Sequence, residues 1–131
     1  MKNLILSALA ATLLSVSCVA PAGHVMLPVS GPLMRQVTRV VERHDAYVTA
    51  DGSLSAEVRG EYITQSQGAV QLMLSMPEVP ANMLAPRLAP VLDRHDSYVD
   101  ADMSLDALVR DTYLASSSGL RSLLSEARWS R

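Results

Sequence analysis

The sequence predicts an all-α fold, in which two tandem copies of a helical hairpin form a four-helix bundle with internal pseudo-twofold symmetry. The main observation is a repeat: RHDAYVTAD at Arg43–Asp51 returns as RHDSYVDAD at Arg94–Asp102. Apolar residues also recur at the spacing of one helix face in both copies. The chain has no Phe and one Trp, so its core must consist of Leu, Val, Met and Ala, a mixture that favours helices.

The length fits one small domain, since the chain has 131 residues. We expect residues 33–131 to form it, with one repeat at about 33–76 and the other at about 84–127. An open solenoid needs about three repeats or more. The two hairpins are therefore expected to bury their apolar faces against each other.

Each copy contains two apolar stripes separated by a polar stretch. In the first copy this stretch includes Asp51 and Ser53, either of which is suited to cap the following helix. The stripes of the first copy are Leu33, Val37, Val40, Val41, His44, Tyr47 and Val48, then Leu54, Val58, Tyr62, Ala69, Leu72 and Met73. Those of the second are Leu88, Val91, Leu92, His95, Tyr98 and Val99, then Leu105, Val109, Tyr113, Leu120, Leu123 and Leu124.

Prolines mark the connector between the hairpins. Pro77 and Pro80 are expected to end the first hairpin. Pro86 and Pro90 follow near the start of the next helix, which must then begin late or bend.

The N-terminal segment has the organisation of a secretory signal. One cation, Lys2, precedes an apolar run from Leu4 to Val16 and then small residues. The run is too short, and too often interrupted by Ser and Thr, for a membrane span of about 20 residues. We expect a signal peptide at 1–22, or at 1–17 if the chain is a lipoprotein, and a linker at 23–32.

Cys18 is the only cysteine, so it cannot form a disulfide within the chain. The stretch Leu14–Cys18 resembles a bacterial lipobox. The resemblance implies that Cys18 is lipidated, becomes the mature N-terminus and holds the protein on a membrane, facing the periplasm. The alternative is cleavage after Ala22 in an A-x-A pattern, which would release a soluble periplasmic or secreted protein beginning at Gly23.

The repeated His-Asp pairs are the first candidates for chemistry. His44 and His95 fall near the middle of an apolar stripe, with Asp45 and Asp96 on its flank. Twofold packing would bring these four side chains into a cluster suited to zinc, manganese or iron.

The sequence favours a structural alternative, in which each histidine is hydrogen-bonded in the core to Tyr47, Tyr98 or an aspartate. In this alternative Arg43, Arg59 and their counterparts in the second copy form ion pairs at the flank.

Oxygen-bearing side chains alternate after the second His-Asp pair. Their spacing resembles the calcium loop of an EF-hand, although Leu105 stands where that loop has Gly. The alternative is a helix start, capped by Asp102 or Ser104 and favoured by Asp106 at its positive end. The calcium ligands would be Asp100, Asp102, Ser104, Asp106 and Asp111.

Composition and motifs favour a binding role over catalysis. The formal charge of −2 gives no reason to expect nucleic acid as a partner, and there is no phosphate loop, dinucleotide fingerprint or nucleophile elbow, so no cofactor is expected. We expect an exported, lipid-anchored bundle that acts as a binding or scaffold module for another protein of the cell envelope. The alternatives are a periplasmic metal-binding or hydrolytic protein centred on the His-Asp pairs, and a soluble secreted inhibitor or phage-encoded envelope factor. Because arginines around an aromatic residue are common at interfaces, the candidate contacts are Arg121, Arg128, Trp129 and Arg131.

Overall fold

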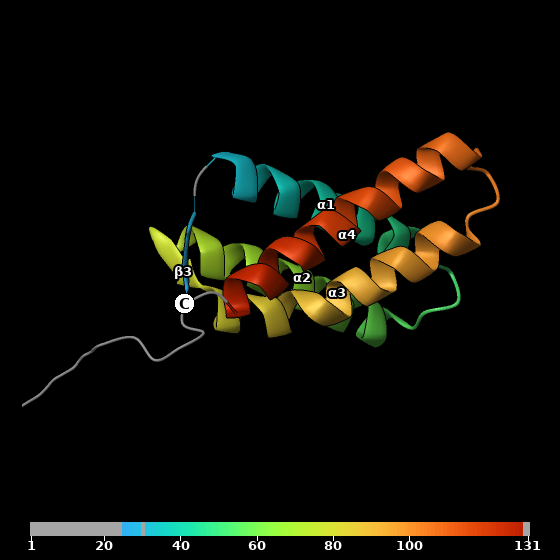
Figure 1. The fold of residues 1–131 in the computed structure, drawn as a ribbon. Coiled ribbons are helices and arrows are strands. Elements are labelled where there is room, and N and C mark those ends of the chain that lie inside the picture. Colours follow the sequence, from blue (N-terminus) through green and yellow to red (C-terminus); the bar gives the residue numbers. More distant parts are fainter. Residues whose placement is uncertain (1–24, 30, 130–131) are drawn as a thin grey trace, which may run out of the picture.

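The computed structural model describes residues 25–29 and 31–129, with side chains as far as residue 125. This part of the chain contains four helices and two short strands, and the helices fit a four-helix bundle (Figure 1). The helical class and the four helices are therefore as the sequence predicts. The first hairpin consists of α1 (Gly31–Ala50) and α2 (Ala56–Leu74), and the second of α3 (Ala81–Ala101) and α4 (Ala107–Trp129).

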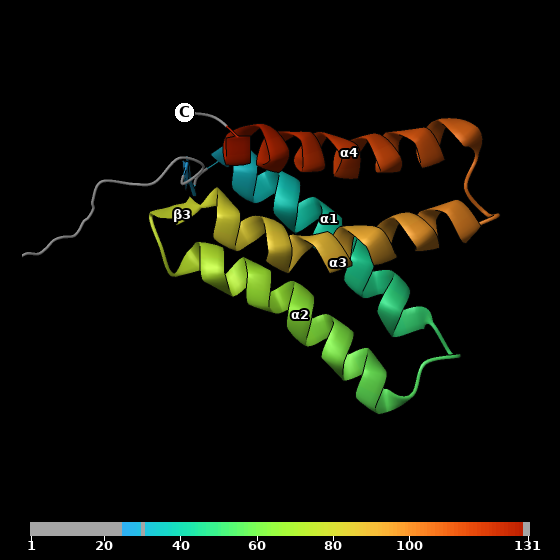
Figure 2. The same cartoon turned by 60° about the horizontal axis from the view of Figure 1, so that its bottom comes forward.

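The first helices of the two hairpins carry most of the core. Figure 2 shows α1 and α3 crossing in the middle of the molecule, with α2 and α4 on either side. The predicted stripes on α1 and α3 are buried except for Tyr47 and Tyr98, which are half-buried. The second helices bury fewer side chains and keep small ones at the contact, because Ser66, Ala69 and Ser117 are fully buried. Small side chains let neighbouring helices approach closely.

The prolines of α3 lie inside the helix. α3 begins at Ala81, upstream of Pro86 and Pro90, so of the two expected alternatives, a late start or a bend, the late start is wrong. Pro86 is exposed and Pro90 half-buried, whereas Leu84 and Leu88 on the opposite face are fully buried. Proline removes one backbone donor per ring, and a carbonyl freed on the outer face can bond to water. Burial of the inner face therefore holds the helix despite both prolines.

A strand pair closes one end of the bundle. The segment expected to be a linker contributes β2 (Met26–Pro28), which pairs antiparallel with β3 (Glu78–Pro80). In this pair Leu27 lies opposite Val79, and both side chains are buried. Residues 25–29 are thus packed against the connector between the hairpins. No helix among the described residues is long and apolar enough to cross a membrane.

Candidate functional site

The two repeated histidines lie at the centre of the bundle. His44 on α1 and His95 on α3 have no exposed surface. The Nδ1 atom of each lies within hydrogen-bonding distance of the next residue in the chain, 2.8 Å from Asp45 Oδ1 and 2.9 Å from Asp96 Oδ1. The structural alternative, a histidine bonded to an aspartate, is therefore correct.

The other ring nitrogen of each histidine accepts a hydrogen bond from the opposite hairpin. Arg94 Nε donates to His44 Nε2 at 3.2 Å, and Arg43 Nε donates to His95 Nε2 at 3.1 Å. An accepting Nε2 cannot carry a proton, so Nδ1 carries it and donates to the aspartate. Burial lowers the pKa of both histidines; the bond to the aspartate offsets this in part, and the facing arginine lowers the pKa further. Both imidazoles are held neutral in one tautomer.

Both carboxylate oxygens of Asp45 and of Asp96 accept hydrogen bonds. One oxygen of each accepts a hydrogen bond from a buried serine, and the other accepts from a longer side chain on the second helix of the same hairpin. Although burial opposes ionisation, the bonds from Ser117, His95 and Arg121 hold the pKa of Asp96 below its usual value. The donors are Ser66 and Gln67 for Asp45, and Ser117 and Arg121 for Asp96.

Two tyrosines join the hairpins one turn further along α1 and α3. The rings of Tyr47 and Tyr98 stack with centroids 5.4 Å apart and planes at 8°. Tyr47 Oη donates to Asp102 Oδ2 at 2.8 Å, and Tyr98 Oη donates to Asp51 Oδ2 at 2.7 Å. Burial and these carboxylates raise the pKa of both tyrosines to about 12. The tyrosines therefore bond to turn aspartates and not, as one expectation had it, to the histidines.

The arginines that meet the histidines also cover tyrosine rings. The guanidinium carbon of Arg43 lies 4.1 Å from the centroid of Tyr113, and that of Arg94 lies 3.9 Å from the centroid of Tyr62. These arginines thus make cation–π and imidazole contacts across the hairpins, and not the flank ion pairs that were expected. We call this set of residues the polar seam: Arg43, His44, Asp45 and Tyr47 with Arg94, His95, Asp96 and Tyr98.

The metal prediction is not supported by this arrangement. Among the described residues, no group of three or more His, Cys, Asp or Glu side chains is placed to hold a metal ion. A metal would need the Nε2 lone pair of His44 or His95, and each of these already accepts from an arginine. The four side chains serve hydrogen bonding between and within the hairpins.

The calcium prediction is not supported by this arrangement. Asp102 Oδ1 accepts from the Ser104 backbone amide at 3.0 Å, while Asp102 Oδ2 accepts from Tyr47. Asp100 lies on α3 and Asp111 on α4, both exposed, and no group of three or more His, Cys, Asp or Glu side chains in the described part of the chain is placed to hold a metal ion. The oxygens that alternate in sequence stabilise a turn.

The helix caps also differ from the expected residues. Asp106 Oδ1 accepts from the Val109 amide at 2.9 Å and caps α4. Ser55 caps α2 in the same way, since its side chain accepts from the Val58 amide at 3.2 Å. The residues expected to cap these helices instead stabilise the preceding turns. In each turn the aspartate accepts a hydrogen bond from the backbone amide of the serine two residues later, Asp51 from Ser53 and Asp102 from Ser104.

The predicted partner-binding residues are only partly placed. Arg121 pairs with Asp93 at 2.9 Å and with Asp96 at 3.1 Å, so its charge is used within the chain. Arg128 and Trp129 belong to the last turn of α4, and their side chains lie outside the described part. Cys18 and Arg131 also lie outside the described residues.

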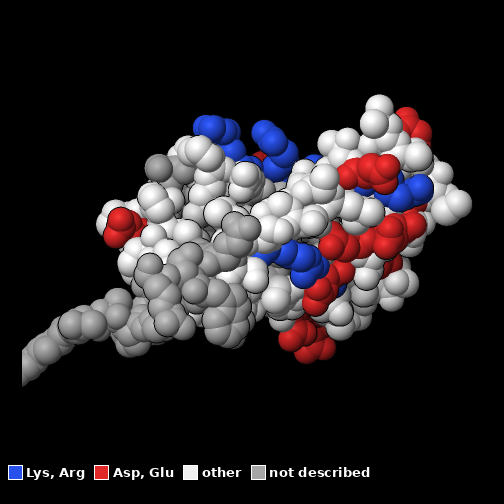
Figure 3. Space-filling model, in the orientation of Figure 1, with Lys and Arg blue, Asp and Glu red and all other residues white. Residues whose placement is uncertain are grey.

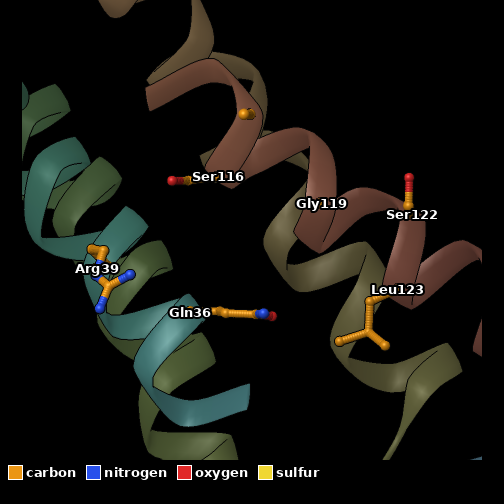
Figure 4. Close-up of a pocket in the computed structure, with 7 residues that line it drawn as sticks. Gln36, Arg39, Ser116, Gly119, Ser122 and Leu123 are labelled. Carbon is orange, nitrogen blue, oxygen red and sulfur yellow. The ribbon is translucent and has the colours of Figure 1, made fainter. Parts of the chain in front are cut away.

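The structure contains a cleft that the sequence does not predict. It lies between α1 and α4 and has a volume of about 420 Å³. Figure 4 shows Gln36 reaching from α1 towards α4, and Ser116 pointing back towards α1. The residues that line the cleft are Gln36 and Arg39 on α1, and Ala115, Ser116, Gly119, Ser122 and Leu123 on α4.

Comparison with known proteins identifies no relative from which a function could be carried over. No protein-family model matches the chain, and neither a curated protein nor a solved structure matches it significantly.

Proposed function

We propose that this chain is a non-catalytic binding module of the bacterial cell envelope, exported and tethered through a lipid on Cys18. A non-catalytic role is supported by the hydrogen bonding of the polar seam, which leaves no ring nitrogen of its histidines free. Both ring nitrogens of His44 and of His95 are bonded to other side chains, and both imidazoles are fully buried.

Catalysis would require a group that the seam does not offer. A general base needs a free lone pair within hydrogen-bonding reach of a substrate. Neither His44 nor His95 has one, and the raised pKa of Tyr47 and Tyr98 disfavours their ionised forms. The seam is better suited to join two hairpins than to act on a substrate.

We further propose that the hairpins are related by an internal pseudo-twofold axis that passes between the stacked rings of Tyr47 and Tyr98. The support comes from reciprocal contacts: the Arg43–His95 bond has its counterpart in Arg94–His44, with lengths of 3.1 and 3.2 Å. The bonds of the two tyrosines to the turn aspartates, at 2.8 and 2.7 Å, form a second such pair. In both kinds of contact, each residue of the first copy has an identical residue 51 positions later in the chain.

The arrangement of the ends suits a tethered protein. The strands β2 and β3 lie at one end of the bundle, and both hairpin turns lie at the other (Figure 1). A lipid on Cys18 would leave only a short segment before β2. The bundle would then stand on the membrane by its strand end, with its turns directed away from the lipid.

The mass of the mature protein tests the tether. We expect a chain that begins at acylated Cys18 in the membrane fraction, and a Cys18→Ser variant that loses both the lipid mass and the membrane association. A wild-type chain that begins at Gly23 in the soluble periplasm would overturn the tether and leave a diffusible binding protein.

A further inference from the structure

The end of the bundle that carries the strands exposes apolar side chains. Met26, Leu74 and Met83 are 42%, 62% and 40% exposed. They belong to β2, to the last residue of α2 and to the first turn of α3. The strand pair brings these segments together, because β2 lies antiparallel to β3, the strand between α2 and α3. Figure 1 shows β3 at the end opposite the hairpin turns, so the three side chains share this strand end.

The outer side of the strand pair is mostly apolar. The middle residue of each strand is buried on the inner side. Because side chains alternate along a strand, the flanking residues face outwards, Met26 opposite Pro80 and Pro28 opposite Glu78. Glu78, the one charged residue of this side, is thus at the other end of the pair from Met26. Apolar side chains clustered on a surface mark a contact with a partner or a membrane.

Charged side chains are segregated along the bundle. The strand half contains one acidic residue, Glu78, and all other acidic side chains that the structure describes lie in the turn half. Figure 3 shows acidic side chains gathered where α3 joins α4, and basic ones over the first turns of α1. Negative charge is therefore directed away from the strand end. The strand half consists of residues 25–29, 31–40, 66–91 and 119–125.

Three exposed arginines lie in the strand half. Arg35 and Arg39 are in the first half of α1, and Arg87 is in the first half of α3. None of them forms an ion pair with another described residue. Arg121, also in this half, differs because it pairs with two aspartates. The charge of the three exposed arginines is available to an anionic partner.

The proposed tether would hold this end near lipid. The chain from Cys18 to Val25 can span about 25 Å at most, because each residue adds no more than about 3.6 Å. The 20 residues of α1 make a helix about 30 Å long. The strand end is thus the part of the bundle that an acylated Cys18 would keep closest to the membrane.

We propose that the strand end binds the surface of a membrane that contains anionic phospholipids. Met26, Leu74 and Met83 enter the boundary between headgroups and acyl chains. The three exposed arginines bind phosphate groups around them, for which a planar guanidinium is well suited. A second copy of the chain fits less well, since it would bring the arginines of two strand ends together. The inference deepens the proposed tether and rests on it for the choice of a lipid partner.

Vesicle binding without the lipid anchor tests the surface itself. The protein is the mature chain with Cys18→Ser, and the probes are vesicles of phosphatidylcholine with phosphatidylglycerol and vesicles of phosphatidylcholine alone. We expect the protein to float with the anionic vesicles, to bind the neutral ones much more weakly, and to be released by added salt, which screens the arginines. Equal binding to both kinds of vesicle, or none to the anionic ones, would overturn the inference.

Matched substitutions locate the surface. The combination Met26→Gln, Leu74→Gln and Met83→Gln removes the apolar side chains without changing the charge and should weaken binding about tenfold or more. Met103→Gln with Leu108→Gln makes the same change at the turn end, where both side chains are exposed, and should bind as the wild type does. Since every replaced residue is exposed, the helical circular dichroism should stay the same in both variants. Equal weakening in both would contradict binding through the strand end.

The arginines are tested in the same assay. Arg35→Gln and Arg87→Gln should each weaken binding to anionic vesicles about fivefold and leave the weak binding to neutral vesicles unchanged. An unchanged affinity for anionic vesicles in the double variant would count against the arginine contacts and overturn the preference for anionic lipid.

Methionine methyl signals report the orientation on the membrane. With ¹³C-labelled methyl groups and an anionic bilayer that contains a nitroxide-labelled lipid, the signals of Met26 and Met83 should broaden, whereas that of Met103 should not. Broadening of Met103 as strong as that of Met26 would overturn the proposed orientation.

The surface and the tether can fail separately. If the natural protein carries lipid on Cys18 but its Cys18→Ser form does not bind anionic vesicles, this inference is overturned and the tether stands. If the natural protein begins at Gly23 and binds anionic vesicles, the surface is supported and only the tether is overturned. Dimerisation in solution that the triple glutamine variant abolishes, without vesicle binding, would identify a second copy as the occupant and overturn the lipid assignment.

Discussion

Acidification is expected to weaken the fold through His44 and His95. Burial lowers the pKa of both imidazoles below the ordinary value of about 6.5. In the unfolded chain each imidazole takes up a proton near pH 6.5, whereas in the folded protein it stays neutral to lower pH. The unfolded state therefore binds more protons in this window, and stability falls as the pH decreases.

The magnitude follows from proton linkage. One excess proton in the unfolded state changes the free energy of unfolding by about 1.4 kcal/mol per pH unit. Two equivalent histidines give at most about 2.8 kcal/mol per pH unit, a limit approached below pH 6.5 while the folded imidazoles stay neutral, and this is a large fraction of the stability of a small domain. Asp51, Asp96 and Asp102 also have lowered pKa values, but their contribution is lost only below about pH 4, where these carboxyls begin to protonate in the unfolded chain.

Urea unfolding followed by circular dichroism between about pH 7.5 and 5 measures this dependence. We expect the slope to be roughly halved in His44→Gln, which removes one titrating group and keeps the other. The reasoning is refuted if the unfolding free energy is the same at both ends of this range. It is also refuted if the Hε1 resonances of His44 and His95 titrate near pH 6.5 in the folded protein.

Three further substitutions test the packing and the polar contacts by chemical denaturation. Leu88→Ala removes a fully buried side chain and should lower the free energy of unfolding by about 3 kcal/mol. The control Leu108→Ala, at a position that is 77% exposed, should change it by less than about 0.5 kcal/mol. Equal effects of the two substitutions would contradict the packing. Ser66→Ala removes the buried hydroxyl that donates to Asp45 and should cost about 1 to 2 kcal/mol, so a loss no larger than that of Leu108→Ala would count against this bond. Asp106→Ala removes the cap of α4 and should cost about 1 kcal/mol, most of which Asp106→Ser should restore.

The helices could be predicted because their signal is local. Leu33, Val37 and Val40 lie three or four residues apart, a spacing that marks one face of a helix, and all three are buried. The strands β2 and β3 could not be predicted in this way. Three residues are too few to show alternation, and their partner lies about fifty residues away in a proline-containing segment.

The histidines were correctly placed on the apolar face, but their partners were not. A helical wheel puts Arg43 on the flank of its own helix, where a salt bridge is the usual expectation. Its actual acceptor, His95, is on another helix, and only the crossing of α1 and α3 brings the two together.

Some residues that line the cleft differ from their counterparts in the other copy of the repeat, and composition does not show these differences. Aligning the copies pairs Gln65 with Ser116 and Pro90 with Arg39. These differences gain a meaning only when the structure shows that Gln65 serves Arg94, and that the equivalent Arg43 lacks an acceptor among the described residues. Divergence between duplicated segments is therefore most informative at positions where one copy makes a buried contact.

The polar seam also explains why two similar apolar faces meet in a single register. Val and Leu side chains of comparable volume can be exchanged in a core at modest cost, so apolar stripes alone would tolerate a shift of one helical turn, about 5.4 Å. Such a shift would part His44 from Arg94 and leave buried polar groups without partners, each at a cost of about 1 to 3 kcal/mol. The seam thereby fixes the register of α1 against α3. Arg43 takes part in this register directly, because its Nε donates to His95 Nε2 on the other hairpin.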